Sequence, residues 1–166
     1  MIKDSKKLSE KNRDKLADFI KKNAVAYGVG CVDNKVIDQI NILNATFKAM
    51  HIALDEINTQ FDKIYVDGNR FKTYLNKQGD FMPHTCLIEG DNKLLQIAAA
   101  SILAKTYRDK MVIDLSNSDP KYEVYGWNKN KGYGTKQHMD AILSHGLTEH
   151  HRVTFCKSIV SRSSHQ

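Results

Sequence analysis

The sequence contains few cysteines, and their spacing argues against two ways of stabilising a fold. Cys31, Cys86 and Cys156 are the three cysteines of the chain, and no two of them form a Cys-x-x-Cys pair. Cysteines that are odd in number and far apart do not indicate a disulfide framework or a structural zinc site. We expect unreactive thiols in a reducing compartment. Three histidines, His145, His150 and His151, have neither nearby cysteines nor an HExxH pattern, so they do not indicate zinc either.

Long apolar runs are also missing. No run approaches the roughly 18 to 20 apolar residues that cross a bilayer. The stretch IKDSKKLSEK after Met1 is too charged for the apolar part of a signal peptide. We expect a cytoplasmic protein with no membrane partner. Because we find no internal repeat, linker or low-complexity tract, we predict a single domain over residues 1–166.

Positive charge is in moderate excess and is clustered. The formal net charge is +6 and the pI is about 9.1. This excess is compatible with nucleic acid, with an anionic membrane surface, or with neither. Lysines gather in KDSKKLSEKNRDK and in WNKNKGYGTKQH. Each cluster is either a binding surface or simply a solvated face.

Hydrophobic periodicity predicts several helices. Residues 9–23 begin with Ser9, a favoured helix N-cap. Residues 41–57 place four apolar side chains on one helical face, namely Phe47, Met50, Leu54 and Ile57. Small residues beside that face permit close packing of another segment; they are Ala45, Ala49 and Ala53. Shorter or longer helices are expected over residues 36–40, 92–115 and 135–145.

Short β-rich segments alternate with these helices. We predict strands over residues 24–32, 63–69 and 84–90, a loop rich in turn formers over residues 116–134, and a closing segment of strand or helix character over residues 151–160. Alternating strands and helices indicate the α/β class.

Two carboxylates stand where ligands gather in α/β proteins. Asp67 closes the strand IYVD, and Asp91 follows the strand TCLIE and precedes the long apolar helix. Carboxylates brought together at such a place repel each other unless a cation lies between them, and hard oxygen ligands suit Mg²⁺ or Mn²⁺. Each residue also has a structural interpretation: VDGN is a favoured hairpin turn, and Asp91 is a favoured helix N-cap.

Six segments, taken together, resemble type 2 ribonuclease H, also called ribonuclease HII. In chain order they are DSKKLS, NILNATFKAM, VDGN, GDNKLLQIAAASILAKTYRD, KGYGTKQH and HRVTF. The resemblance covers nearly the whole chain, and the combination of the first, fourth and fifth motifs is highly specific. It implies a mixed sheet of the ribonuclease H type flanked by helices, with a helical region at the C-terminal end.

The resemblance also implies an activity. The family hydrolyses the RNA strand of RNA–DNA hybrids and cuts on the 5′ side of ribonucleotides embedded in duplex DNA, using divalent metal. By the resemblance, Asp67 and Asp91 match the third and fourth metal-binding carboxylates, and the expected cofactor is Mg²⁺ or Mn²⁺. Two metals about 4 Å apart can activate water and stabilise the leaving oxyanion. Roles in DNA replication and ribonucleotide excision repair would follow, and we expect a monomer.

Five further residues are implied in substrate binding. Tyr133 matches a tyrosine that stacks on the sugar following the ribonucleotide. Lys6 and Lys7 match positions that contact the nucleic-acid backbone, and Lys131 and Lys136 would extend this basic surface. Phosphate contacts of this kind position a duplex without reading its sequence. Three residues at matching family positions, His138, His151 and Arg152, are interpreted as framework residues that bind backbone or carboxylate groups.

One motif of the family is not found in the sequence. The family opens with an Asp-Glu pair followed by Gly-Arg-Gly, which supplies two metal carboxylates and reads the ribose 2′-hydroxyl. No such combination occurs in the 166 residues, and Met1 stands three residues before DSKKLS. The Asp-Glu of LDEI lies within a predicted helix and lacks the glycines. We therefore expect the first two strands of the sheet to be missing, which leaves the edges of the strands at residues 24–32 and 63–67 unpaired.

Two functions from different classes follow. The chain is either a metal-dependent endonuclease or a non-catalytic nucleic-acid-binding remnant of the same fold. A fragment of an active enzyme, a half that needs a second chain, and a degenerate relative are all consistent with the sequence. Metal dependence separates the two functions, because a nuclease requires the cation and a binding module does not.

Overall fold

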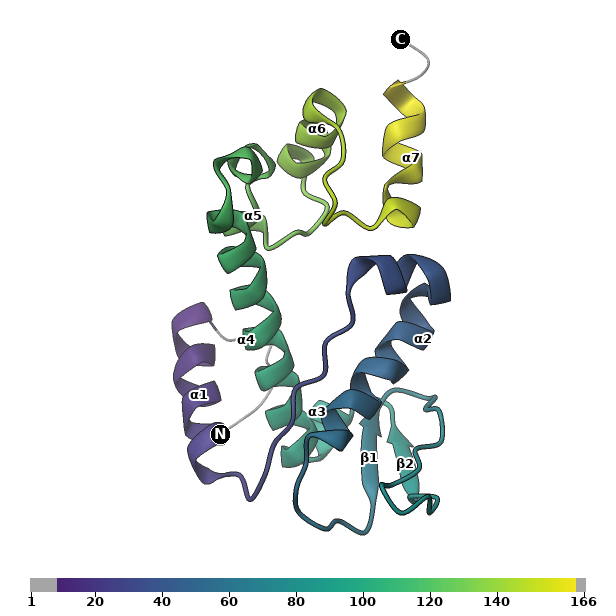
Figure 1. Ribbon diagram of the computed structural model, residues 1–166. Helices are drawn as coiled ribbons and strands as arrows, with labels where there is room; N and C mark the ends of the chain where they lie inside the picture. The colour runs from purple at the N-terminus through teal and green to yellow at the C-terminus, as the bar shows by residue number, and fades with distance from the viewer. Residues whose placement is uncertain (1–8, 164–166) are drawn as a thin grey trace. The chain divides into compact units, whose positions relative to one another are not determined.

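The computed structural model describes residues 9–163 (Figure 1). Contacts within the chain divide it into two compact units. Within the described residues, the first contains residues 9–32 and 43–107, and the second contains residues 33–42 and 108–163.

A small parallel sheet forms the centre of the first unit. Strand β1 (Ile64–Asp67) pairs in register with β2 (His84–Leu87), so that Ile64 faces His84 and Asp67 faces Leu87. Ile64 and Val66 are buried, while the alternate residues of β1 are exposed. The buried side chains pack with Tyr74 and with apolar side chains that include Met50, Leu54, Phe71 and Met82. Within residues 9–163, β1 has β2 as its one strand neighbour.

The predicted strand over residues 24–32 is wrong. This segment is irregular and pairs with no strand among the described residues. It runs instead against the backbone of α2 (Asn34–Asp55): a Cβ atom at Gly28 would overlap the carbonyl oxygen of Ala53, and one at Gly30 would overlap that of Ala49. The predicted close approach beside the alanines of α2 is confirmed. The β-rich composition failed as a signal because a strand requires a hydrogen-bonding partner, and composition does not supply one.

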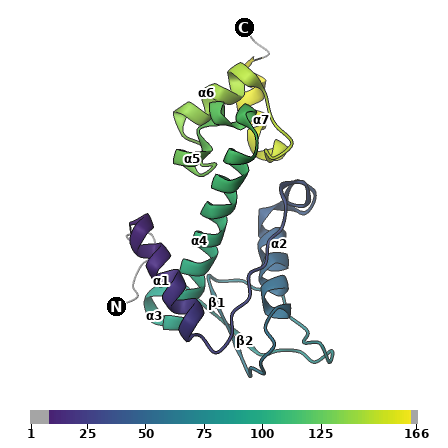
Figure 2. The same cartoon turned by 60° about the vertical axis from the view of Figure 1, so that its left-hand side comes forward.

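Helix α1 (Glu10–Asn23) follows the prediction closely. Ser9 is its N-cap, and the Ser9 hydroxyl accepts a hydrogen bond from the backbone N–H of Asn12 at 3.4 Å. Its Ala17 and Ile20 side chains pack on Ile102 and Leu103, which lie in α4 (Leu95–Ser118). Helix α1 lies next to the first part of α4 in both views, and the two helices cross in the second view (Figure 1 and Figure 2).

The single helix expected over residues 92–115 is interrupted. A four-residue helix, α3 (Gly90–Lys93), ends at Leu94, whose φ of −126° and ψ of 127° are extended. Helix α4 then runs from Leu95 to Ser118; residues 95–107 belong to the first unit and residues 108–118 to the second. Side-chain periodicity could not reveal this break because Leu94 fits an apolar helical pattern.

The second unit is helical. The short helices η1 (Pro120–Tyr125) and α5 (Trp127–Asn130) occupy the stretch that we predicted to be a loop, which corrects that prediction. Helix α6 (Lys136–His145), with Thr135 as N-cap, confirms the helix expected over residues 135–145. It is not the last helix, because α7 (Val153–Ser163) shows that the closing segment is helical. The core contains six buried side chains: Tyr122, Tyr125, Trp127, Ala141, Ile142 and Cys156. Burial of three aromatic rings explains why turn-forming residues adopt helical turns here.

Helix α2 has a kink that assigns its two parts to different units. Asn41 has a φ of 64° and a ψ of 165°, which are not helical. Residues 33–42 belong to the second unit, where Asp38 accepts a hydrogen bond from the backbone N–H of Val153 at 2.7 Å at the start of α7. The predicted separate helix at residues 36–40 is therefore confirmed as the part of α2 before the kink. Among the described residues, we find no helix with both the length and the apolar character that crossing a membrane requires.

Candidate functional site

The two candidate carboxylates lie at one edge of the sheet. Asp67 is the last residue of β1, and Asp91 is the second residue of α3, shortly after β2. Because β1 and β2 are parallel, their carboxyl ends meet at the same edge. The backbone N–H of Gly90 donates a hydrogen bond to Oδ1 of Asp67 at 2.8 Å. This bond joins the end of β1 to the start of α3 and brings the two aspartates into one neighbourhood.

The structural interpretations of both aspartates are wrong. VDGN is not a hairpin turn, because the strand after Asp67 pairs in parallel rather than antiparallel fashion. Asp91 is not the N-cap of its helix: that position is Glu89, which has a left-handed φ of 54° and makes no side-chain capping bond. Neither carboxylate is therefore explained by turn formation or helix capping.

Gly90 is a site residue that the sequence reasoning missed. It is buried, and a Cβ atom at this position would lie 2.7 Å from Cδ1 of Ile97 and 3.4 Å from Cβ of Leu87. The close approach lets the Gly90 N–H reach Asp67. The available signal was a glycine directly before Asp91, at the last position of the strand predicted over residues 84–90.

The donor set fits a magnesium-like cation in its chemistry. Asp67 and Asp91 offer hard carboxylate oxygens, and Mg²⁺ is commonly held by one or two carboxylates together with waters and substrate phosphates. Among the described residues, no group of three or more His, Cys, Asp or Glu side chains is placed to hold a metal ion. Within residues 9–163, Asp67 and Asp91 remain the candidate ligands that the sequence predicts.

The candidate substrate residues of the second unit gather in one loop. Lys131 and Gly132 have left-handed φ angles of 51° and 73°, and they lead to Tyr133, which is 55% exposed. The guanidinium of Arg108 lies 4.7 Å from the centre of the Tyr133 ring. Arg108 also forms an ion pair with Asp109 at 3.2 Å. An exposed aromatic ring with a cation over one face is an element suited to nucleic acid.

Two of the four candidate lysines, Lys131 and Lys136, lie within the described residues. Lys131 Nζ donates a hydrogen bond to the backbone oxygen of Asn128 at 2.7 Å, and Lys136 is exposed at the first turn of α6. Lys6 and Lys7 lie outside the described residues. The structure thus places the candidate metal ligands Asp67 and Asp91 near each other in the first unit. The candidate substrate residues Lys131 and Tyr133 lie in one loop of the second unit.

The framework role expected of two histidines is confirmed. His138 Nδ1 lies 3.0 Å from the backbone oxygen of Tyr133. The Nδ1 atom of His151 accepts the backbone N–H of Thr148 at 2.9 Å. The third residue, Arg152, places its guanidinium 3.9 Å from the centre of the Phe155 ring.

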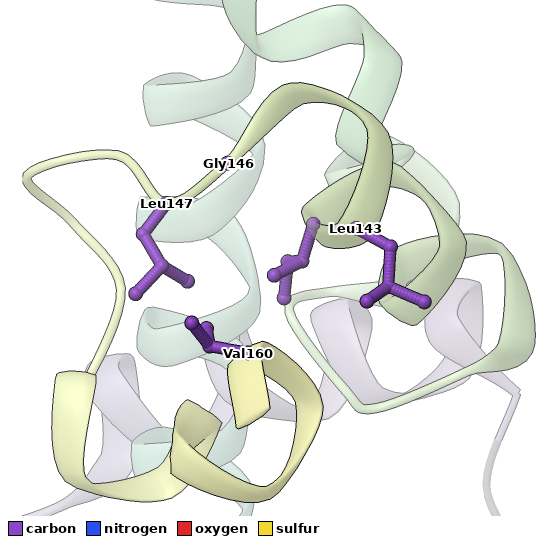
Figure 3. A pocket seen from close by; sticks show the side chains of 5 residues that line it. Leu143, Gly146, Leu147 and Val160 are labelled. Atoms are coloured by element: carbon purple, nitrogen blue, oxygen red, sulfur yellow. The ribbon is translucent and has the colours of Figure 1, made fainter. Parts of the chain in front are cut away.

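A pocket in the second unit has none of the candidate substrate residues in its lining (Figure 3). It is lined by Ile142, Leu143, Gly146, Leu147 and Val160, from α6, the segment after it, and α7. Its lining side chains carry no polar group, so the pocket offers nothing to hold a phosphate or a metal ion.

Comparisons with known proteins agree in sequence and in fold. The family model described as Ribonuclease HII matches residues 1–158. The chain is 51% identical over 155 residues to Ribonuclease HII of Bacteroides fragilis (strain ATCC 25285), covering 93% of this chain and 73% of that protein. It is 50% identical over 155 residues to Ribonuclease HII of Bacteroides thetaiotaomicron, covering 93% of this chain and 74% of that protein.

A solved structure supports the fold. The crystal structure of the ribonuclease H2 from Pyrococcus horikoshii OT3 superposes with a TM-score of 0.77 at 24% identity, covering 99% of this chain and 82% of that chain. The expected ribonuclease H-like α/β fold is confirmed by this likeness.

Proposed function

Because the chain belongs to the ribonuclease HII family, and is thereby a ribonuclease of the H type, we propose that it hydrolyses the RNA strand of RNA–DNA hybrids. We further propose that it cuts on the 5′ side of ribonucleotides embedded in duplex DNA. The observation that carries this proposal is the pair of aspartates at one sheet edge, with Asp67 bonded to the backbone N–H of Gly90 at 2.8 Å.

Asp67 and Asp91 are the residues that would hold divalent metal, either Mg²⁺ or Mn²⁺. When bound, such ions supply a water activated for attack on the phosphodiester and stabilise the leaving 3′-oxygen. The contribution of the chain is orientation. Gly90 keeps one oxygen of Asp67 in a fixed hydrogen bond, and the sheet and α3 carry the two carboxylates on rigid elements rather than on a loop.

The proposed contacts to the duplex come from the exposed ring of Tyr133 and from four lysines. The exposed ring of Tyr133 would stack on the sugar that follows the ribonucleotide, and the guanidinium of Arg108 lies over the same ring. Lys131, Lys136, Lys6 and Lys7 would bind backbone phosphates. These phosphate contacts would position the duplex and make its affinity depend on salt.

Cleavage of a labelled DNA duplex containing one ribonucleotide tests the catalytic proposal. With Mg²⁺ or Mn²⁺, we expect Asp67→Asn and Asp91→Asn to reduce cleavage by on the order of a hundredfold or more, because each removes a metal-binding charge. Asp62→Asn is the matched control, since Asp62 is an exposed aspartate just before β1. Equal cleavage by the two site variants and the control would exclude Asp67 and Asp91 as catalytic ligands.

A non-catalytic nucleic-acid-binding module is the second candidate. Such a module would bind the duplex equally well in a chelator, cut nothing at any Mg²⁺ or Mn²⁺ concentration, and lose affinity steeply with salt. Metal-dependent cleavage that is lost in Asp67→Asn excludes this alternative.

A further inference from the structure

A buried pair of histidines lies directly beneath the loop that carries Tyr133. His138 and His151 are each 6% exposed, and their Nε2 atoms are 3.1 Å apart. Trp127, the one tryptophan of the chain, places its Nε1 atom 3.0 Å from Nε2 of His138. On its other side, Nδ1 of His138 is 3.0 Å from the backbone oxygen of Tyr133. The chain of contacts therefore ends at the backbone of the proposed substrate residue.

The donors and acceptors in this chain determine where each ring proton sits. The backbone N–H of Thr148 donates to Nδ1 of His151, so the neutral His151 ring carries its proton on Nε2 and donates it to His138. Nε2 of His138 accepts this bond and the bond from the Trp127 N–H. The proton of a neutral His138 is consequently on Nδ1, where it is donated to the carbonyl oxygen of Tyr133.

Burial keeps His151 in this neutral state. Desolvation, together with the neighbouring His138, lowers the pKa of His151 to about 4. A proton added to Nε2 of His138 would face two other donors. The arrangement with the His138 proton on Nδ1 is therefore the one that keeps every hydrogen bond of the chain.

We propose that His138 is a positioning residue for Tyr133: its Nδ1–H, oriented by His151 and Trp127, holds the main chain of Tyr133 where the ring meets the substrate. The inference rests on the substrate role proposed for Tyr133. It goes beyond a framework role, because it states that the hydrogen bond from Nδ1 of His138 to the Tyr133 carbonyl affects substrate binding.

Local geometry explains why the Tyr133 loop benefits from such a bond. The backbone N–H of Thr135 also donates to the Tyr133 carbonyl at 2.8 Å, and the Tyr133 N–H donates to the Asn130 oxygen at 2.9 Å. These bonds close the turn locally, whereas the His138 bond ties it to the buried core of the second unit. The exposed Tyr133 ring also contacts Arg108, but that contact acts on the ring and not on the main chain that His138 holds.

Two substitutions separate the two ring nitrogens of His138. In His138→Asn the side-chain amide can replace Nδ1–H as the donor to Tyr133, and in His138→Gln the amide oxygen can replace Nε2 as the acceptor from Trp127. The readout is the ratio of affinities for a duplex with one ribonucleotide and an all-DNA duplex, measured by fluorescence anisotropy in a chelator. Cleavage with Mg²⁺ is measured in parallel, and urea unfolding followed by Trp127 emission checks folding. His145, exposed near the end of α6, provides matched control variants.

We expect His138→Gln to lower the affinity ratio by roughly three- to tenfold, the worth of one hydrogen bond, while His138→Asn retains most of it. In a Tyr133→Ala background the difference between the two variants should vanish, because the bond then positions no ring. Equal losses in both variants, or a His138→Gln effect that persists unchanged in Tyr133→Ala, would overturn the proposal. If Tyr133→Ala alone leaves the affinity ratio unchanged, the substrate role of Tyr133 itself is wrong, which is a separate failure.

Discussion

A single methyl group added at position 90 should damage the candidate metal site without touching either carboxylate. Gly90→Ala places a Cβ atom 2.7 Å from Cδ1 of Ile97, well inside van der Waals contact. Ile97 is 6% exposed, so its side chain has little room to move away. The backbone at residue 90 must shift instead, and the N–H of Gly90 then moves away from Oδ1 of Asp67.

The change in the free energy of unfolding of Gly90→Ala is the difference between two opposing effects. Overpacking of this kind costs about 1 to 3 kcal/mol, and replacing glycine by alanine in a helix returns up to about 1 kcal/mol. We expect a net loss of about 1 to 2 kcal/mol in the free energy of unfolding, which lowers the Tm by about 2 to 8 °C for a chain of this size. Cleavage should fall on the order of tenfold to a hundredfold, because small displacements of catalytic groups are costly.

A second substitution tests the steric cause. Ile97→Val removes Cδ1 and leaves the nearest remaining atoms, Cγ2 of Ile97 and Cβ of Leu87, at 3.4 Å from the new methyl group. Ile97→Val alone should cost about 0.5 to 1.5 kcal/mol. The double variant should nevertheless cleave faster than Gly90→Ala, as measured by single-turnover cleavage beside thermal unfolding. Wild-type cleavage by Gly90→Ala, or no recovery in the double variant, would refute the reasoning.

Two further predictions concern the second unit. Arg108→Lys keeps a positive charge beside Asp109 but removes the planar guanidinium over the Tyr133 ring. We therefore expect the variant to bind the ribonucleotide-containing duplex about two- to fivefold more weakly, as measured by fluorescence anisotropy. Unchanged affinity would show that the contact between Arg108 and Tyr133 does not contribute to substrate binding. The pKa of His151 is lowered to about 4 by burial, against 6.5 for an ordinary histidine. Between these values the unfolded chain binds more protons than the folded chain, so this contribution to stability is complete above about pH 6.5 and is lost as the pH falls toward 4. Urea unfolding at a series of pH values should show this slope, and His151→Gln should flatten it; an equal slope in the variant would contradict the assignment.

The elements that were predicted well are those set by neighbouring residues. Ser9 caps α1 through a bond to a residue three positions away, and Thr135 does the same for α6 through the backbone N–H of His138. The strands β1 and β2 were found because short apolar runs end at turn formers. The family was identified from motifs, and the comparisons confirm it because those motifs are sequence patterns themselves.

The elements that were predicted wrongly depend on contacts between residues that are far apart along the chain. Residues 24–32 have the composition of a strand, but their backbone runs along Ala49 and Ala53 of α2 instead of pairing with a strand in the described part of the chain. The break at Leu94 and the helical turns of η1 and α5 likewise depend on contacts that lie outside a local window. The helical turns of η1 and α5 are decided by the packing of Tyr122, Tyr125 and Trp127 in one core.

By itself, the sequence determined the family, the helices with local caps, and the identity of Asp67, Asp91 and Tyr133 as candidates, because all of these are encoded in residues close together along the chain. Only the tertiary structure decided that Gly90 binds Asp67, that Arg108 covers Tyr133, and that His138 reaches the Tyr133 backbone. Each of those contacts depends on the path of the folded backbone, and a hydrogen bond or ring contact exists only once that path brings its two groups within a few ångströms.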